Sequence, residues 1–566
     1  MKFSHIGRIR AVSIIIIIFA FFIIGKLYVV QIVEGDTYSE KADRQYSSSG
    51  GSLFTRASIF FQSKDGELVS AATLKSGYII AVNPQIIKNP EEAYNKLNEI
   101  FPINKEDFLA KATKVDDPYE EIAKRVDEEV GLKVADLKIS GLNIYKDRWR
   151  FYPGGNIAAH TLGFMGYSGN DFAGRYGLER FYENNLERKP TSYINFFAQV
   201  FANISDDKIN SNSGDIVTSI EPTLQLYLQE ELASTTEKWN SEYTGGIIMN
   251  PKTGEIYAMS IDPSFDPNDP QSQKSSVIFS NKLVEDVYEM GSIIKPLTVA
   301  MGIDMGLILP SSTYYDSGSV MVSGKKISNF DGKERGVVTI QEALSESLNV
   351  GMVHIAKLVG NDKQREYFYN FGLNQKTNID LPNESANLVK NLESPRDIEH
   401  ATASFGQGIA MTPISTIRAL ATIANGGVLV EPHLVKTINY KTGLSKNYVA
   451  PPVTRVIKPE TAEEVTRMMV YSVDNVLLGG KAKIENYSVA VKTGTAQIAK
   501  PGGGGYSETD VLHSFVGFVP AYDPQFFIFL YTVKPKGIRF SSETLTLPFF
   551  DIVKFVINYY ELTPDR

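Results

Sequence analysis

The chain has no cysteine in 566 residues, and its six histidines are widely scattered. The absence of cysteine excludes disulfides, thiolate nucleophiles and cysteine-based zinc or iron–sulfur sites. No two histidines form an HExxH pair, so the sequence does not indicate a metal site. The chain also lacks an excess of basic residues: its formal net charge is -8, whereas a nucleic-acid partner favours a basic face. Hydrophobic and charged contents of 43% and 22% are ordinary for a folded protein, and the length predicts about three or four domains.

Long apolar runs are scarce as well, and the one that stands out lies near the N-terminus. Residues Ala11–Val33 (AVSIIIIIFAFFIIGKLYVVQIV) are long enough for one membrane-spanning helix. Lys2, Arg8 and Arg10 precede the run, which predicts that residues 1–10 stay in the cytoplasm and the rest of the chain lies outside. A cleaved signal peptide is the alternative, but the run is at the upper length limit for one, and no small-x-small cleavage site follows it. We therefore expect an uncleaved, single-pass anchor over residues 11–33.

The remaining chain divides at a polar, turn-forming stretch, Asn203–Gly214 (NISDDKINSNSG). Residues 34–215 mix short strand-like runs with a charged section, Pro90–Asp136, which is typical of solvated helices and turns. Residues 216–566 predict an α+β domain, because strand patterns stand at both ends with helical patterns between them. The expected elements of this domain are a strand near 215–220, a helix from Thr223, a hairpin over 245–260, strands at Ser488–Val491, Ser514–Val519 and Phe526–Val533, and a helix at Phe549–Tyr560. We expect these strands to form one antiparallel sheet from distant segments.

Ser292 stands three residues before Lys295 in the stretch Glu289–Leu297 (EMGSIIKPL). An S-x-x-K pattern alone is weak, since a chain of this length holds about two by chance. Two other matches lie in polar, turn-like surroundings: Ser205/Lys208 and Ser323/Lys326. Ser292 instead opens an apolar helical stretch, on which residues three apart share a face. Burial of that face would lower the pKa of Lys295 and make it a competent base for a serine nucleophile. The alternative is that Ser292 caps the helix and Lys295 extends into solvent.

Two further motifs favour the nucleophile. Ser347-Leu348-Asn349 and Lys492-Thr493-Gly494 follow Ser292 in the order in which serine acyl-enzymes carry S-x-x-K, S-x-N and K-T-G motifs. Similar strings elsewhere lie before the serine or in turn-like contexts: Ser168–Asn170, Ser385–Asn387, Ser445–Asn447, Lys252–Gly254 and Lys441–Gly443. Lys492–Gly494 alone directly ends an apolar strand. Such a strand can bind an extended peptide as an added strand, and Gly494 would allow its backbone to approach closely.

With these motifs the sequence resembles class B penicillin-binding proteins, which are membrane-anchored peptidoglycan transpeptidases. The resemblance spans nearly the whole chain. Its pedestal segments are Arg150–Gly155 (RFYPGG), Ala159-His160, Gly163, Gly166 and Gly177–Glu179, and its transpeptidase segments are Phe405–Gly408 (FGQG) and His513–Pro520 (HSFVGFVP). The septal, cell-division branch is the more similar one, ahead of the elongation branch. The family implies an elongated mixed α/β pedestal over residues 34–215 and a penicillin-binding transpeptidase domain, an antiparallel sheet covered by helices, over residues 216–566.

Three positions depart from the family pattern. Met290 stands where the family usually has proline, Leu348 where many members have a small or polar residue, and Arg56–Leu68 resembles the RGxIxDRNGxxLA pattern only loosely. No segment resembles a glycosyltransferase. The resemblance therefore implies that a polytopic membrane polymerase makes the glycan and contacts the transmembrane helix and pedestal, together with division proteins. It also implies a bacterial cytoplasmic membrane with the catalytic domain outside.

The resemblance implies acyl transfer from a stem peptide. Ser292 attacks the carbonyl between the two terminal D-alanines, and an amine of a neighbouring stem then takes the acyl group. Lys295 is the expected base, Ser347 relays a proton to the leaving amine, and Asn349 holds the substrate amide and Lys295. β-Lactams should acylate Ser292 as well, and no metal or organic cofactor is needed.

The remaining expected roles concern substrate binding. Lys492 would keep the pocket positive and lower the pKa of Lys295 further. The hydroxyls of Thr493 and Thr495 would bind the terminal carboxylate, and the backbone N–H groups of Ser292 and Thr495 would form the oxyanion hole beside Gly494. We expect His160 and His513 to pack rather than to react, and Gly502–Gly505 to form a flexible loop or a gate beside the cleft.

Other functions stay open at this point. In a D,D-carboxypeptidase or a β-lactamase, water would take the acyl group; the large pedestal and anchor favour crosslinking instead. A β-lactam sensor would need a cytoplasmic or polytopic transducer, and only residues 1–10 precede the apolar run. A non-catalytic division scaffold is disfavoured because all three motifs are intact.

Overall fold

The computed structural model describes Phe19, Lys26 and residues 54–115, 117–169, 171–188, 213–500 and 505–566. The predicted anchor over residues 11–33 lies almost wholly outside these ranges, as do most of the predicted boundary at Asn203–Gly214 and most of the Gly502–Gly505 loop. Within the described ranges no helix is long and apolar enough to cross a membrane. The anchor and the domain boundary at residue 215 therefore stay predictions.

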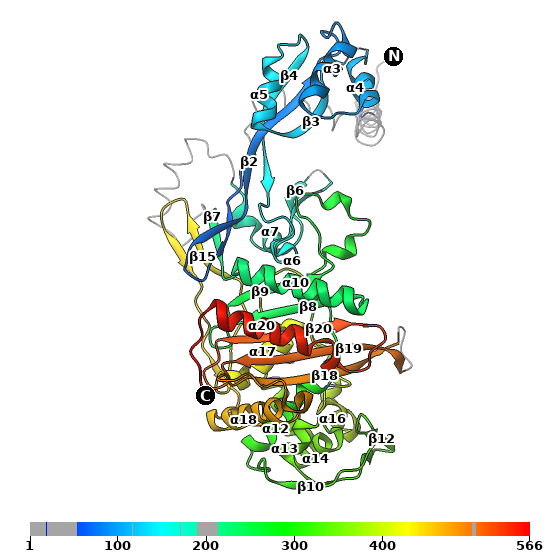
Figure 1. The fold of residues 1–566 in the computed structure, drawn as a ribbon, viewed down its shortest axis with the longest axis vertical. Helices are drawn as coiled ribbons and strands as arrows, with labels where there is room; N and C mark the ends of the chain where they lie inside the picture. Colours follow the sequence, from blue (N-terminus) through cyan, green and yellow to red (C-terminus); the bar gives the residue numbers. More distant parts are fainter. Residues whose placement is uncertain are drawn as a thin grey trace, which may run out of the picture. The chain divides into compact units, whose positions relative to one another are not determined.

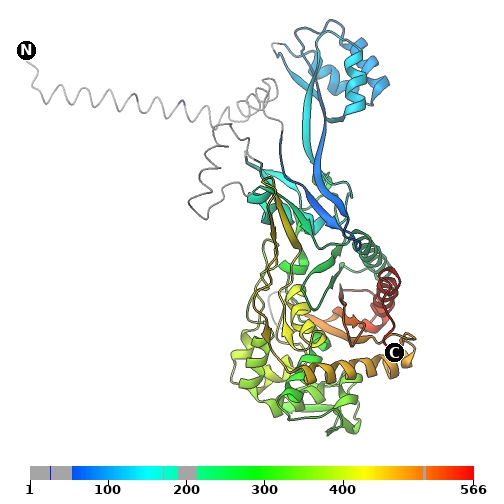
Figure 2. The same cartoon turned by 90° about the vertical axis from the view of Figure 1, so that its left-hand side faces the viewer.

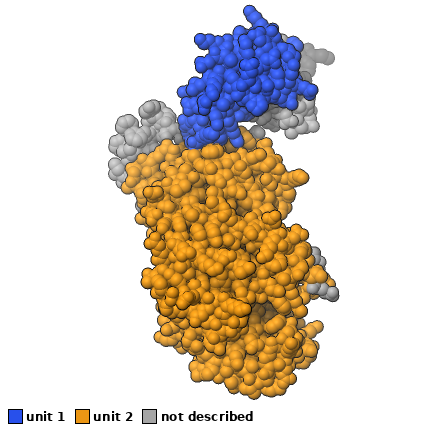
Figure 3. Space-filling view, in the orientation of Figure 1, with its two compact units in different colours: residues 1–55, 74–149 blue, residues 56–73, 150–566 orange. Residues whose placement is uncertain are grey.

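The chain forms two compact units (Figure 3). One consists of Met1–Thr55 and Leu74–Trp149, and the other of Arg56–Thr73 and Arg150–Arg566. Two long strands, β2 (Leu68–Val82) and β4 (Leu142–Phe151), contribute residues to both units. The larger unit holds all the motifs named above.

The smaller unit packs helices on a short piece of sheet. Its helices are α3 (Pro90–Ile100), α4 (Lys105–Ala112) and α5 (Glu128–Asp136), and the side chains of Asn89 and Asn104 cap the first two. The section Pro90–Asp136 was expected to hold helices and turns, but it also contains a strand, β3 (Glu120–Asp127), antiparallel to β2. Ile122 and Val126 of β3 pack on the core of this unit. The five charged residues of EEIAKRVD mask that alternation in the sequence.

The pedestal segments of the larger unit meet at a buried group of charges. We call Arg56, Arg150, Tyr152, Glu179 and Glu183 the pedestal network. Glu179 accepts hydrogen bonds from Arg56 Nε at 2.6 Å, Arg150 Nε at 2.5 Å and Tyr152 Oη at 3.2 Å. Burial alone would raise the pKa of Glu179, yet Arg150 and Arg56 together hold it below its ordinary value. The RFYPGG and GLE segments and the loosely matching Arg56 segment thus serve one structural contact.

Beside this network lies a mixed sheet. Strand β1 (Ile59–Gln62) pairs antiparallel with β2 and parallel with β7 (Gly214–Thr218), and β7 pairs antiparallel with β15 (Val435–Tyr440). β16 (Ser445–Asn447) completes that edge. The short helix α6 (Ala159–Leu162) carries Ala159-His160 and has Gly163 as its C-cap, α7 (Gly177–Phe181) carries Gly177–Glu179, and α8 (Glu183–Leu186) begins with Glu183 of the pedestal network. His160 packs among them as expected: it is buried, its Nε2 lies 2.9 Å from the Ile278 carbonyl, and burial lowers its pKa to about 4.

A five-stranded antiparallel sheet forms the centre of the domain predicted over residues 216–566. Its order is β18 (Ala490–Ala499), β19 (Tyr506–Val519), β20 (Phe526–Val533), β8 (Tyr243–Met249) and β9 (Ile256–Asp262). This confirms the predicted sheet from distant segments and its β8–β9 hairpin, with one correction. The strand predicted near 215–220 is β7, which pairs with β1 and β15 in the mixed sheet instead. The central strand β20 is buried on both faces, which explains its unbroken apolar sequence FFIFLYTV.

Helices cover both faces of this sheet. Helices α10 (Pro222–Trp239) and α20 (Thr546–Tyr559) lie side by side on one face (Figures 1 and 2), where leucines of α10 and aromatic and β-branched residues of α20 form one core cluster. On the other face lie α12 (Lys295–Asp304), α13 (Ile340–Ser345), α14 (Asn349–Val359), α17 (Pro413–Ala424) and α18 (Pro459–Asn475). The α+β architecture predicted for this domain is therefore confirmed.

The shorter elements connect these layers. They are β5 (Met165–Ser168), β6 (Asp171–Gly174), α11 (Lys282–Glu285), β10 (Thr313–Asp316), β11 (Ser319–Val322), β12 (Lys325–Ser328), β13 (Gly336–Thr339), α15 (Asn361–Asn370), α16 (Asp397–Ala403), β14 (Val428–Leu429), β17 (Thr454–Arg455) and α19 (Ser541–Thr544). Of these, the loop between β12 and β13 and the segment before α19 reach the catalytic cavity.

Candidate active site

Ser292 lies in a 3₁₀ turn, η4 (Gly291–Ile294), that leads directly into α12 at Lys295. Residues three apart eclipse each other in a 3₁₀ turn, so Ser292 and Lys295 project on the same side. No side-chain cap is formed at either helical start, and Lys295 is fully buried. The alternative of a capping serine and a solvated lysine is therefore wrong.

Lys295 and Lys492 share one serine hydroxyl, and we call Lys295, Ser347 and Lys492 the catalytic cluster. Ser347 Oγ lies 3.1 Å from Lys295 Nζ and 3.0 Å from Lys492 Nζ. Lys295 Nζ also donates to the Ser347 carbonyl at 2.5 Å, and Lys492 Nζ donates to the Thr493 carbonyl at 3.0 Å. Ser347 takes a left-handed backbone, φ 58°, the kind of strained position that concentrates at functional sites.

The positive charges of Lys295 and Lys492 repel each other. Burial and then the charge of Lys492 lower the pKa of Lys295 well below its ordinary value. Burial lowers the pKa of Lys492 to about 7. The pair titrates as a unit, and the fully buried Lys295 gives up its proton more readily. Near neutral pH the cluster therefore offers a neutral amine beside Ser347 and one turn from Ser292.

Asn349 does not make the contact expected with Lys295, and its role towards the substrate amide stays a prediction. Its Nδ2 donates to the Ser328 carbonyl at 2.9 Å, and the lysine Nζ bonds to Ser347 instead. Asn349 thus fastens the end of β12 to the start of α14, a contact between distant segments that no sequence motif encodes. Its side chain still lines the cavity.

The K-T-G motif lies in the middle of β18 rather than at its end, and β18 is an edge strand of the sheet. Gly494 faces the turn that carries Ser292: a Cβ there would stand 2.4 Å from Ser514 Oγ and 2.9 Å from the Met290 carbonyl. The serine turn thus makes a close approach at Gly494, whereas the approach of a substrate backbone to this strand stays a prediction. The same packing places Gly291 against β18: a Cβ at Gly291 would lie 2.8 Å from the carbonyl oxygen of Thr495.

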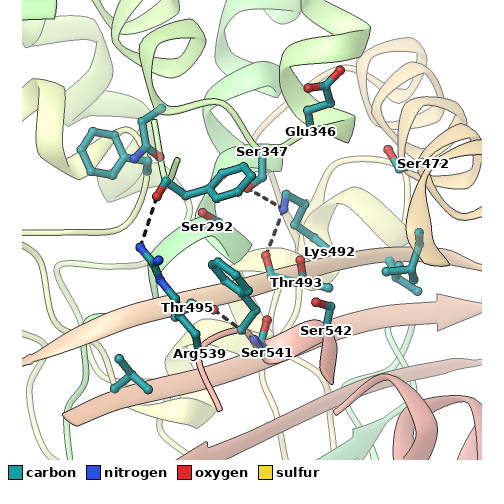
Figure 4. Close-up of a pocket in the computed structure, with 18 of the residues that line it drawn as sticks. Ser292, Glu346, Ser347, Ser472, Lys492, Thr493, Thr495, Arg539, Ser541 and Ser542 are labelled. Atoms are coloured by element: carbon teal, nitrogen blue, oxygen red, sulfur yellow. Dashed lines mark hydrogen bonds between the residues drawn. The ribbon is translucent and has the colours of Figure 1, made fainter. Parts of the chain in front are cut away.

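A cavity of about 940 Å³ opens over these groups (Figure 4). Six predicted site residues line it: Ser292, Ser347, Asn349, Lys492, Thr493 and Thr495. Lys295 and Gly494 lie behind this surface. Thr495 Oγ1 accepts a hydrogen bond from the Ser541 N–H at 3.1 Å, which leaves the threonine proton free to donate to a bound anion.

Other lining residues were missed by sequence reasoning. Among them are Phe330, Glu346, Ser472, Leu478, Arg539 and Phe540. They come from loops and from the end of α18, and only the tertiary fold brings them to the cleft. His513 does not line it: the ring is buried in β19, its Nε2 donates to the Arg539 carbonyl at 3.1 Å, and its Nδ1 lies 2.9 Å from Thr544 Oγ1. Burial lowers its pKa to about 4, so it packs as a neutral side chain. Nowhere in the described ranges do three or more acidic or histidine side chains gather as a metal site.

Comparison with known families agrees with this geometry. The family model "Penicillin binding protein transpeptidase domain" matches residues 244–551, more than half of the chain, and "Penicillin-binding Protein dimerisation domain" matches residues 63–194. The chain belongs to the penicillin-binding protein transpeptidase family. The resemblance to class B members, with a pedestal and a serine transpeptidase domain, is thereby confirmed, as is the predicted class of enzyme.

Several relatives match over most of their length. Stage V sporulation protein D of Bacillus subtilis is 30% identical over 539 residues, 92% of this chain and 81% of that protein. Peptidoglycan D,D-transpeptidase FtsI of Escherichia coli K12 is 27% identical over 454 residues, 78% of this chain and 73% of that protein.

Solved structures share the fold. Penicillin binding protein 3 of Mycobacterium tuberculosis, complexed with aztreonam, gives a TM-score of 0.67 at 25% identity and covers 75% of this chain and 92% of its own. Penicillin binding protein 2X of Streptococcus thermophilus gives a TM-score of 0.73 at 21% identity, and the match covers 89% of this chain and 79% of that protein.

Within the family pattern, the two departures beside the catalytic motifs have structural explanations. Met290 is fully buried, and its carbonyl accepts a hydrogen bond from Ser514 Oγ at 2.9 Å. Leu348 is also fully buried in the helical core. Both side chains point into the protein, so neither alters the polar groups that face the cavity.

Proposed function

We propose that the protein crosslinks peptidoglycan by D,D-transpeptidation through an acyl-enzyme on Ser292. The observation that carries this proposal is the catalytic cluster, in which a buried lysine with a lowered pKa lies one turn from the serine and shares a hydroxyl with a second lysine. In the described part of the cavity, no carboxylate accepts a hydrogen bond from Lys295 Nζ or Lys492 Nζ. The arrangement therefore favours a neutral amine that acts as a base over an ion pair.

The first half-reaction forms the acyl-enzyme. Neutral Lys295 takes the Ser292 hydroxyl proton while Oγ attacks the carbonyl between the terminal D-alanines. The backbone N–H groups of Ser292 and Thr495 stabilise the oxyanion, a contribution of about 3–4 kcal/mol for a donor of this kind. The C–N bond then breaks, and the leaving D-alanine amine receives a proton from the lysine pair through Ser347.

The second half-reaction transfers the acyl group. An amine of a neighbouring stem attacks the ester carbonyl and gives up its proton to the cluster. The ester C–O bond breaks, and Ser292 regains its proton. Lys492, Thr493 and Thr495 hold the carboxylate of the donor during acylation, with Thr495 oriented by the Ser541 N–H.

β-Lactams should acylate the same serine. The structures of M. tuberculosis penicillin binding protein 3 complexed with aztreonam and with ampicillin support this expectation for the chain. A strained amide in the position of the D-alanyl bond would meet the same base and the same carboxylate-binding groups.

We further propose that residues 11–33 anchor the protein in the bacterial cytoplasmic membrane with its catalytic domain outside, where it works at the division septum. The relatives named FtsI support the septal role. A polytopic glycan polymerase would be the partner at the helix and pedestal. A second candidate is crosslinking during sporulation, which the Stage V sporulation relative supports.

The test of crosslinking against hydrolysis is product analysis. Full-length protein in detergent would receive a thioester donor that ends in D-alanyl-thioglycolate, with and without a D-amino acid as acceptor. A transpeptidase gives mostly the acceptor adduct. A carboxypeptidase or β-lactamase gives hydrolysed donor whether or not the acceptor is present, and a scaffold consumes no donor at all.

A further inference from the structure

One cation of the cavity has no part in the acyl transfer above. Arg539 lies on the segment between β20 and α19 and lines the cavity. In Figure 4 it lies on the other side of Ser292 from Glu346. Its Nη2 donates one long hydrogen bond, 3.4 Å, to the Phe330 carbonyl. Across the residues that the structure describes, no carboxylate forms an ion pair with it, so its remaining N–H groups are available to a ligand.

Neutral groups hold this arginine in place. Its carbonyl accepts from buried His513 Nε2 at 3.1 Å, and two residues later the Ser541 N–H binds Thr495 Oγ1. Its guanidinium carbon lies 5.2 Å from the centre of the Phe540 ring, and that ring meets Phe330 edge-on at 5.7 Å. The guanidinium therefore lies against an aromatic ring at the wall of the cavity.

The charged groups near Arg539 leave its guanidinium available to a negatively charged ligand. Lys492, another lining cation, is already assigned to the terminal carboxylate and also donates to Ser347 and Thr493. Glu346, a lining carboxylate, pairs with Arg335 at 3.2 Å. The terminal carboxylate of a donor peptide already has its place at Lys492, Thr493 and Thr495. The Arg539 segment is bonded to Thr495 through the Ser541 N–H, so Arg539 lines the same cavity as the groups that hold the donor.

We propose that Arg539 binds a second carboxylate of the donor, carried by the residue that precedes the terminal D-alanine pair. The planar fork of a guanidinium matches a carboxylate with two parallel hydrogen bonds. This inference rests on the proposed function, since it assigns the substrate class of the same site: stem peptides whose third residue keeps a free carboxylate, in preference to neutral or amidated ones.

The test compares two thioester donors that both end in D-alanyl-thioglycolate. They differ only in the preceding residue, which carries a free carboxylate in one donor and the matching carboxamide in the other. The full-length wild-type protein should favour the carboxylate donor in kcat/KM by about tenfold or more, the effect of a charge-assisted hydrogen bond. In Arg539→Gln the two donors should agree within about twofold, and Arg539→Lys should keep a reduced preference.

Arg335→Gln is the matched control. Arg335 stacks on the same Phe330 ring at 5.9 Å, but it pairs with Asp331 and Glu346 and does not line the cavity. The donor preference should survive its loss. Equal kcat/KM values in the wild type, a preference that persists in Arg539→Gln, or an undiminished preference in Arg539→Lys should Arg539→Gln fail to fold, would each overturn the inference. Failure of penicillin and both donors to acylate Ser292 would instead overturn the proposed function, and the inference with it.

Discussion

In the pedestal network Glu179 is buried between two arginines, whereas in the catalytic cluster two buried lysines share one serine hydroxyl. The first arrangement pairs opposite charges and holds the pKa of Glu179 below its ordinary value. In the second, burial lowers the pKa of both lysines, and the charge of Lys492 lowers the pKa of Lys295 further. A buried charge with an oppositely charged partner therefore supports the fold, whereas buried charges without such a partner have shifted pKa values that suit catalysis.

The two regions also respond to pH through different protonation states. The folded-state pKa of Glu179 is lowered, so its stabilising contribution is present above the ordinary carboxyl range and is lost as pH falls through the lowered value. The folded-state pKa of Lys492 is lowered from 10.5 to about 7, so the folded state carries a penalty below about pH 7 that disappears as pH rises towards 10.5. Acid thus weakens both regions, one by losing a charge pair and the other by forcing two like charges together.

Removing the catalytic base should have the largest effect. Lys295→Met should lower the rate of acylation by penicillin by about 10³-fold, because no neutral amine remains to take the Ser292 proton. The free energy of unfolding should change little, since a similar apolar side chain replaces a buried lysine that forms no ion pair with any carboxylate the structure describes. Stopped-flow acylation and urea unfolding measure the two quantities. A large loss of stability with an unchanged acylation rate would show that Lys295 is structural.

Disrupting the pedestal network should lower the stability of the protein and leave its acylation rate unchanged. Glu179→Gln leaves two buried arginines without their shared carboxylate, which should lower the free energy of unfolding by about 3–5 kcal/mol. Molecules that remain folded should acylate at the wild-type rate, because Glu179 does not touch the cavity. Glu129→Gln is the control: Glu129 pairs with Lys133 on the surface, and its loss should not change the unfolding midpoint. Equal unfolding curves for both variants would contradict the role assigned to the network.

The smallest expected effect is a change in the shape of a pH profile. Wild-type acylation by penicillin should rise as Lys295 loses its proton and decline above about pH 7 as Lys492 loses the charge that holds the carboxylate. In Lys492→Arg the alkaline decline should disappear, because a guanidinium stays charged throughout the range. The measurement is kcat/KM for acylation from pH 5 to 10. An alkaline limb that survives in Lys492→Arg would assign it to another group.

The motifs and the sheet could be predicted because each has a local signal. Alternation and apolar runs placed β8, β9, β19, β20 and α20 within a few residues, apart from the start of β19. Order and context then selected Ser292, Ser347 and Lys492 from several similar strings. The strand β3 was missed because charge conceals its two apolar contacts with the core.

Contacts between distant segments could not be predicted, because they have no local signal in the sequence. The Asn349 amide binds Ser328, and Gly494 accommodates the Met290 carbonyl more than two hundred residues away. Arg539 and Phe330 meet across a separation of 209 residues. The pedestal motifs were recognised separately, yet their convergence on Glu179 depends on the fold. Such contacts reflect packing geometry, which residue type and spacing do not encode.

The central claim is that Ser292 is the nucleophile of the cavity. The most direct measurement is labelling of the full-length protein with a fluorescent penicillin, wild type beside Ser292→Ala, followed by mass mapping of the labelled peptide. The account predicts a stable adduct on the peptide that contains Ser292 and no adduct in the variant. A label that persists in the variant, or the absence of a label from folded wild-type protein, would contradict it.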